Sequence, residues 1–232
     1  MFDEEIKKQS DKKAFVKEFG YNLLWCKWAF DNYIIKRELR GEKEQWSLKR
    51  LKWYEGKGNQ NRVNYVNTFG AEEDTGGVNK ELIMLLSMFH VSTPTMVYKH
   101  WLNAALYFVF YSYDPESNDP INSTDYIDYL RSLAKSFLFD RYLAKESKIV
   151  EFYDIIYLLD AEPQNQNRPE NLDLSKLNTG TEVENFIFNY LDFILWKEGV
   201  AGSDKFEFGS RSSVEHYYPQ NPIAKDSKLD QE

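Results

Sequence analysis

The sequence predicts a mainly α-helical protein, a helical bundle with a short β element near residues 46–54 and one further strand close to the C-terminus. Apolar residues recur at helical spacing in several segments, and capping residues stand at the ends of these segments. The alternation of apolar and polar residues that is typical of a strand is confined to short stretches. The chain has 232 residues, of which 42% are apolar, and this is enough for a substantial core.

The first predicted helix runs from about Asp11 to Leu39. Ser10 is its expected N-cap and Gly41 its expected end. Its middle, residues 21–30, is apolar on most sides. We therefore expect this helix to lie at the centre of the core.

A short strand or hairpin arm is predicted after the first helix. Residues 46–49 and 51–53 alternate apolar with polar side chains, ahead of a turn signal at Gly56-Lys-Gly58. Residues 59–77 are rich in Asn and Gly and are expected to form a loop. The acidic cluster at residues 72–74 fits solvated charge better than a cation site.

The charge balance limits how this chain can contact nucleic acid. The net charge is -8, which opposes a broad phosphate-binding surface, because nonspecific affinity for nucleic acid rests on Lys and Arg. One basic stretch stands out in the sequence, formed by Arg50, Lys52, Lys57 and Arg62. It is compatible with a local phosphate contact and equally with a solvated face.

Aromatic residues make up 16% of the chain and are distributed through the helical segments. This distribution favours a packed aromatic core over a platform on which nucleobases stack. We therefore expect Trp25, Trp28, Trp101 and Phe137 to be buried.

Further helices are predicted where a capping residue precedes apolar residues at helical spacing. They are residues 80–89 after Asn79, a helix opened by Thr93 and Pro94, one that follows Asn122 and contains Tyr126, Leu130, Leu133 and Phe137, and residues 149–159. Together with the first helix they make a bundle of about five helices.

The last part of the chain is predicted to hold a linker and one more helix. Residues 161–180 contain two prolines and several Asn and Gln residues, as a loop or linker would. Thr181-Glu-Val-Glu184 is a capping box, so a helix is expected from Thr181 to Lys197, with Phe186 and Phe193 facing inward. The predicted domains are therefore a helical bundle at 1–160, a linker at 161–180, and a C-terminal module at 181–232.

The C-terminal module carries the strongest chemical signal. Residues 214–222 read Val-Glu-His-Tyr-Tyr-Pro-Gln-Asn-Pro, and the extended pattern of residues 205–218 places Glu215 and His216 on a predicted strand. Hydrolysis of a phosphodiester needs a base that deprotonates water and a cation that offsets the charge on the phosphate. Histidine can supply the base, and a carboxylate can hold the cation.

This stretch resembles the opening strand of an HNH-type (His-Me finger) nuclease, in the form found in GmrSD-like, modification-dependent (type IV) restriction endonucleases. Residues 84–102 also resemble the helical region that precedes the nuclease strand in that family. The resemblance implies that His216 is the catalytic general base and Glu215 a metal ligand. It further implies a divalent cofactor such as Mg²⁺, DNA that carries modified bases as the substrate, and a role in bacterial defence.

The family pattern continues into a loop and a helix that bring an Asn and a further Asn or His. Residues 223–232 contain neither. We therefore expect the chain to be an inactive fragment that begins an incomplete HNH-like ββα module, with activity in a longer parent. The competing interpretation is a non-enzymatic helical interaction module, in which Glu215 and His216 only pack or form hydrogen bonds.

Other features of the sequence bear on the compartment. Cys26 is the only cysteine, so the sequence offers neither a disulfide framework nor a thiolate metal site. The N-terminus is charged from Asp3 onward, unlike a signal peptide. The longest apolar run, residues 104–111, is far shorter than the ~20 residues that a membrane span needs. These features predict a cytoplasmic protein that does not cross a membrane.

Overall fold

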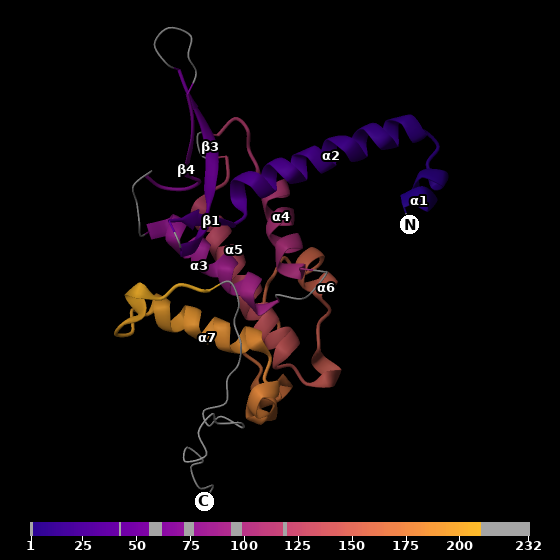
Figure 1. Cartoon of the computed structure of the whole chain (residues 1–232). Helices are drawn as coiled ribbons and strands as arrows, with labels where there is room; N and C mark the ends of the chain where they lie inside the picture. The colour runs from indigo at the N-terminus through magenta and orange to yellow at the C-terminus, as the bar shows by residue number, and fades with distance from the viewer. Residues whose placement is uncertain are drawn as a thin grey trace, which may run out of the picture. The chain divides into compact units, whose positions relative to one another are not determined.

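The computed structural model describes residues 2–41, 43–55, 62–71, 77–93, 99–117 and 120–209. Helices account for most of these residues, and two small antiparallel sheets accompany them (Figure 1). The predicted mainly α fold is thus confirmed. The chain divides into two compact units, one made of Met1–Leu86 and His100–Asp128, the other of Ser87–Lys99 and Tyr129–Glu232. The predicted division into a bundle at 1–160, a linker at 161–180 and a module at 181–232 stays a prediction.

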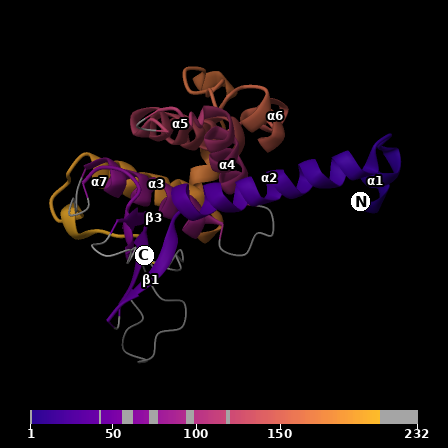
Figure 2. The ribbon, with the colours of Figure 1, turned by 90° about the horizontal axis from the view of Figure 1, so that it is seen from above.

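The first unit opens with α1 (Phe2–Lys8) and the long helix α2 (Lys12–Tyr33), with α1 at the free end of α2 (Figure 2). The N-cap of α2 is Asp11 and not Ser10, because the Asp11 side chain accepts a hydrogen bond from the Ala14 backbone N–H at 2.9 Å. The helix also ends before the predicted Leu39. Ile34 has an extended backbone, and Lys36–Arg40 forms strand β1, whose backbone groups pair with a second strand.

The prediction that α2 lies at the centre of the core is wrong. Only Ala29 and Tyr33 of this helix are buried, and Leu24 is 72% exposed. Near its C-terminal end the helix is held by aromatic contacts. The rings of Trp25 and Trp28 meet the ring of Tyr113 edge-on at centroid distances of 5.9 and 4.9 Å. Trp25 is only half-buried and Trp28 is exposed, so their predicted burial is not observed.

The predicted β element near residues 46–54 is confirmed, and it is larger than expected. Strand β1 pairs with β2 (Lys43–Ser47), and β3 (Lys49–Tyr54) pairs with β4 (Arg62–Asn67), both antiparallel. The prediction of a loop over residues 59–77 is therefore wrong at β4. Its backbone groups find their partners on β3, and this pairing outweighs the local Asn-rich composition.

Helix α3 (Gly77–Ser92) begins before Asn79, so the predicted cap is wrong. Asn79 is buried within the helix and ties it to the hairpin strands. Its side-chain oxygen accepts from the Phe69 N–H at 3.2 Å, and its amide donates to the Leu48 carbonyl at 3.3 Å. The side chain thus satisfies two buried backbone groups beside the sheet.

Helix α4 (His100–Ser112) starts later than the cap signal at Thr93 predicted. The Thr93 hydroxyl donates instead to the Phe89 carbonyl at 3.2 Å, at the end of α3, while Pro94 lies outside the described residues. Trp101 is buried as predicted.

Helix α5 (Ser123–Ser136) agrees with its prediction. The Asn122 side chain accepts hydrogen bonds from the Thr124 and Asp125 N–H groups, as an N-cap does. Tyr126, Leu130 and Leu133 are fully buried. A turn of π-helix, Phe137–Tyr142, continues α5.

The second unit is built around an aromatic core. The aromatic residues of this core come from several segments. The centroid of the Phe186 ring lies 5.8 Å from that of Phe89, 5.9 Å from that of Phe137 and 5.1 Å from that of Tyr142. The remaining elements are α6 (Phe152–Tyr157), α7 (Asn185–Lys197), and the short 3-10 turns Glu146–Lys148, Pro169–Asn171, Leu174–Asn178, Gly180–Glu182 and Ser203–Lys205.

Helix α7 differs from its prediction at one end. It begins at Asn185 rather than Thr181, and no capping box forms, because Val183 and Glu184 have extended ψ angles of 133° and 126°. Phe186 and Phe193 face inward as predicted, with 2% of each exposed. Gly199, at φ 68°, ends the helix in the left-handed conformation that favours glycine.

Residues 161–180, predicted as a linker, are hydrogen-bonded to a buried carboxylate in the second unit. Asp140 is fully buried and accepts from the Gln164 N–H at 2.9 Å and from the Asn165 N–H at 2.7 Å. The Ser136 hydroxyl donates to the Ala161 carbonyl at 2.8 Å. None of the helices in the described ranges combines the length and the apolar character that a membrane crossing requires.

Candidate functional site

The predicted site residues Glu215 and His216 lie outside the described residues, as do Lys57 and the acidic cluster at 72–74. The structure does describe the segment that leads toward them. After Gly199 a short 3-10 turn precedes Phe206 and Phe208, whose rings meet edge-on at 4.9 Å, and Phe208 is buried. The chain is therefore packed into the second unit shortly before Val214. Of the predicted extended stretch 205–218, only residues up to 209 are described, so that prediction stays open.

A second candidate is an exposed apolar face on the β3–β4 hairpin. The strand register sets Leu51 opposite Tyr65 and Trp53 opposite Val63. Because side chains alternate between the two faces of a strand, these four residues share one face, which we call the hairpin patch. Trp53 is 66% exposed and Tyr65 is 68% exposed. Two large aromatic side chains thus lie side by side on a two-stranded ribbon and face solvent.

Basic residues accompany the hairpin patch. Strands β3 and β4 contain Lys49, Arg50, Lys52 and Arg62 and no acidic residue, although the whole chain has a net charge of -8. The Lys49 ammonium pairs with Glu38 at 2.5 Å, which offsets its charge. Lys52 and Arg62 are exposed, Arg50 is half-buried, and the Lys52 ammonium lies 5.1 Å from the Tyr54 ring centroid. The register sets all three on the face opposite the hairpin patch.

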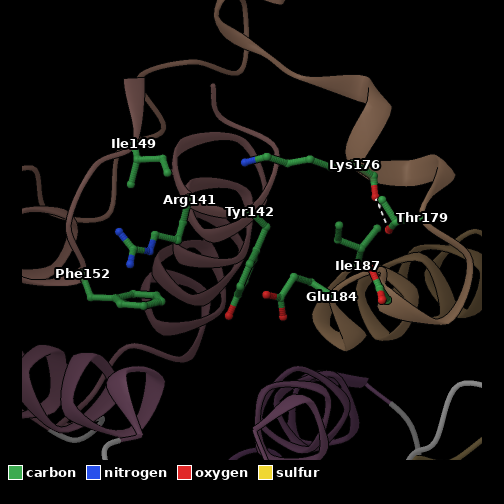
Figure 3. Close-up of a pocket in the computed structure, with 9 residues that line it drawn as sticks. Arg141, Tyr142, Ile149, Phe152, Lys176, Thr179, Glu184 and Ile187 are labelled. Carbon is green, nitrogen blue, oxygen red and sulfur yellow. Dashed lines mark hydrogen bonds between the residues drawn. The ribbon is translucent and has the colours of Figure 1, made fainter. Parts of the chain in front are cut away.

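The second unit contains a cavity of about 500 Å³ (Figure 3). Its two cationic side chains already have partners. Arg141 pairs with Glu151 at 3.1 Å and lies 4.9 Å from the Phe152 ring centroid, and Lys176 donates to the Ala144 carbonyl at 2.7 Å. The cavity walls thus hold their cations in internal contacts.

Tyr142 and Glu184 point toward the same space in this cavity (Figure 3). Burial, and secondly the negative charge of Glu184, raises the pKa of Tyr142 to about 12. The phenol therefore keeps its proton at neutral pH and can act only as a hydrogen-bond donor or acceptor. Among the described residues that line the cavity there is no histidine or cysteine, and Glu182 and Glu184 supply its carboxylates.

Within the described ranges there is no group of three or more His, Cys, Asp or Glu side chains that could hold a metal ion. His90 and His100 are both half-buried and take part in other interactions. Cys26 is a half-buried residue of α2. Glu215 remains the metal ligand that the sequence predicts, outside the described part of the chain.

Two of the four hairpin-patch residues, Val63 and Tyr65, fell in the segment that the sequence assigned to a loop. The signal that identifies them is the alternation in Arg62-Val-Asn-Tyr-Val66, which becomes decisive only with the β3 partner. For Tyr142 no local signal exists, because its environment is made by Glu184 and Phe186 from a distant segment.

Comparisons with known proteins returned no match, whether to a family model, a curated protein or a solved structure.

Proposed function

We propose that this chain is part of an HNH-type, metal-dependent DNA endonuclease that acts in modification-dependent restriction in the bacterial cytoplasm. The observation that carries the proposal is the Glu215-His216 pair within the nonamer 214–222. An acidic residue beside a histidine can supply the two groups that a metal-assisted phosphodiesterase needs at minimum, a metal ligand and a base.

In the proposed reaction His216 takes the proton from the attacking water, and its neutral imidazole is the form that does so near neutral pH. Glu215 contributes a carboxylate oxygen, which is the kind of ligand that Mg²⁺ prefers. A bound divalent cation would offset the charge that builds on the phosphate. The described residues nearest to this motif are Phe206 and Phe208, whose rings meet edge-on and of which Phe208 is buried.

The test is cleavage of modified and unmodified DNA in Mg²⁺ by the complete encoded protein and its His216→Ala variant, at equal folded concentration. Removal of the base should lower the rate by about 10²- to 10⁴-fold, the usual size of general-base catalysis. Glu215→Gln should raise the Mg²⁺ concentration needed for half-maximal rate, because it removes a charged ligand.

His100→Ala is the matched control, because it removes an imidazole that has no proposed role in the chemistry and should leave the rate near that of wild type. Circular dichroism checks that each variant is folded. Equal rates for wild type and His216→Ala would eliminate His216 as the base.

The alternative is a non-enzymatic helical interaction module, and the exposure of α2 favours it. Tyr21, Leu23 and Leu24 of this helix are each at least 60% exposed. An apolar surface of this kind on a long helix is typical of a docking site. Under this alternative, Leu24→Glu would abolish association with a partner while His216→Ala would change neither association nor any nuclease rate.

A further inference from the structure

We propose that the β3–β4 hairpin binds a single-stranded segment of DNA, by stacking unpaired bases on Trp53 and Tyr65 and by contacting phosphates through Arg50, Lys52 and Arg62. The choice of DNA over RNA rests on the proposed function. The binding surface itself rests on the hairpin geometry, independently of Glu215 and His216.

The first line of argument is the exposure of the two aromatic side chains. Trp53 and Tyr65 are diagonal neighbours on the same face, since Trp53 pairs with Val63 and Tyr65 lies two positions further along β4. Diagonal neighbours in an antiparallel pair are roughly 7–8 Å apart, so each ring can receive its own base. About two thirds of each side chain is exposed. Cross-strand packing with Leu51 and Val63 therefore covers only a minor part of the rings.

The exposed rings indicate unpaired bases as the ligand. In a duplex the flat faces of the bases are covered by neighbouring base pairs, and a ring on a protein surface can stack on them only after the strand is opened. Stacking is also tolerant of sequence, because every base has a π-face. The hairpin patch thus suits a locally unpaired strand rather than an intact duplex.

The second line of argument is charge. The two strands hold four basic residues and no acidic one, within a chain of net charge -8. Lys49 pairs with Glu38, and Arg50, Lys52 and Arg62 contribute their positive charge on the face opposite the hairpin patch. The ribbon is only two strands wide, with a strand spacing of roughly 4.8 Å, so long Arg and Lys side chains can reach around its edge.

The positive charge and the exposed aromatic rings together indicate which class of partner the hairpin binds. A concentration of positive charge calls for an anionic ligand, and adjacent exposed aromatic rings call for flat apolar groups. A single-stranded nucleic acid carries both features in every nucleotide. An acidic protein surface would match the charge alone, and an apolar protein surface would match the rings alone.

The experiment measures binding of a fluorescein-labelled oligothymidine of about 16 nucleotides to the whole chain by fluorescence anisotropy, in EDTA so that no cleavage occurs. Trp53→Ala and Tyr65→Ala should each weaken binding by about 5- to 150-fold, the fold-change that corresponds to the loss of one stacked base. Lys52→Gln combined with Arg62→Gln should weaken binding and lower the slope of log Kd against log salt by about 1.4, near 0.7 for each phosphate contact.

Matched controls separate the hairpin from the general surface. Tyr21→Ala removes a tyrosine on α2 that is 67% exposed, almost the same as Tyr65, and it should bind like wild type. Lys12→Gln with Lys13→Gln removes two exposed charges on α2 and should lower the salt slope far less than the hairpin pair. Trp53→Phe keeps a stacking ring, so it should retain most affinity while the quenching of tryptophan fluorescence on binding decreases.

Several results would overturn the inference. One is the absence of oligothymidine binding by wild type, and another is wild-type affinity in both Trp53→Ala and Tyr65→Ala. A third is a loss of affinity in Tyr21→Ala as large as that in the hairpin variants. A fourth is tighter binding of wild type to a duplex than to a single strand of the same length. Thermal melts of Trp53→Ala and Tyr65→Ala show whether a loss of affinity reflects unfolding, and Trp53→Phe and Tyr65→Phe, which keep an aromatic ring, should keep most of the affinity.

The same variants separate this inference from the proposed function. If His216→Ala still cuts at the wild-type rate but the hairpin variants lose oligothymidine binding, the nuclease proposal fails and the binding surface stands. If cutting depends on His216 and the hairpin variants bind like wild type, the binding surface fails and the nuclease proposal stands.

Discussion

Loss of the Asp140 carboxylate should cost a large fraction of the stability of the second unit. Asp140 is fully buried, and two backbone N–H groups donate to it, those of Gln164 and Asn165. A buried N–H without an acceptor costs about 1–3 kcal/mol. Asp140→Ala leaves two such groups, so it should lower the free energy of unfolding by about 2–6 kcal/mol.

Asp140→Asn provides a graded version of the same test. The retained Oδ1 accepts from both Gln164 N, at 3.0 Å, and Asn165 N, at 2.7 Å. In wild type the Gln164 N–H also donates to Oδ2, at 2.9 Å. In Asp140→Asn an amide N–H₂ group takes the place of Oδ2, so two donors would face each other. One contact is lost and one repulsion gained, so the expected cost is about 1–3 kcal/mol, below that of the alanine variant.

The assay is urea denaturation followed by circular dichroism, together with amide hydrogen exchange at Gln164 and Asn165. Both amides should exchange much faster in Asp140→Ala, because their acceptor is gone. Glu146→Gln is the control, since it neutralises an exposed carboxylate of the same unit and should change stability by about 0.5 kcal/mol or less. If the free energy of unfolding of Asp140→Ala lies within that margin of wild type, the carboxylate does not hold Gln164 and Asn165 as described.

Two further predictions concern the aromatic core and the cavity. Phe186→Ala should lower the free energy of unfolding by about 3–5 kcal/mol, because Phe186 is 2% exposed. Phe188→Ala on the same helix should cost far less, since Phe188 is 38% exposed. Urea denaturation compares the two variants, and equal losses of stability would contradict the assignment of Phe186 to the core. The raised pKa of Tyr142, about 12 against 10.0, means that its contribution to stability is fully present below pH 10 and is lost as the pH rises to about 12. Tyr142→Phe should therefore gain stability relative to wild type across that interval. Parallel pH dependences of the free energy of unfolding for wild type and Tyr142→Phe would refute the raised pKa.

Local signals predicted an element well where they agreed with its tertiary environment. For α5 the Asn122 cap and the one-sided spacing of Tyr126, Leu130 and Leu133 are both properties of a short stretch, and the fold buries the face that they define. The inward-facing Phe186 and Phe193 of α7 were predicted for the same reason. The capping box predicted a helix from Thr181, and this prediction was wrong. Val183 and Glu184 would have to be helical for the box to form, and both have an extended backbone.

Strand pairing was the point at which local reasoning failed. Residues 36–40 continue the helical pattern of α2 in sequence, yet they become β1, because β2 offers backbone partners and because Ile34 and Ile35 are buried ahead of the strand. In the same way the Asn-rich composition around residues 62–67 predicts a loop, whereas pairing with β3 makes these residues strand β4. The hairpin patch could not be predicted, because it depends on which residues of two strands stand opposite each other.

The sequence by itself determined the mainly helical class, the short β element, and the Glu215-His216 motif, since each of these rests on the spacing of residues within a short segment. Tertiary structure alone decided where α2 ends, how Asp140 holds Gln164 and Asn165, and which aromatic side chains remain exposed. The physical reason is that burial, hydrogen-bond satisfaction and strand register are properties of pairs of segments. In this chain the decisive pairs, Asp140 with Asn165 and Trp53 with Val63, join residues from separate segments.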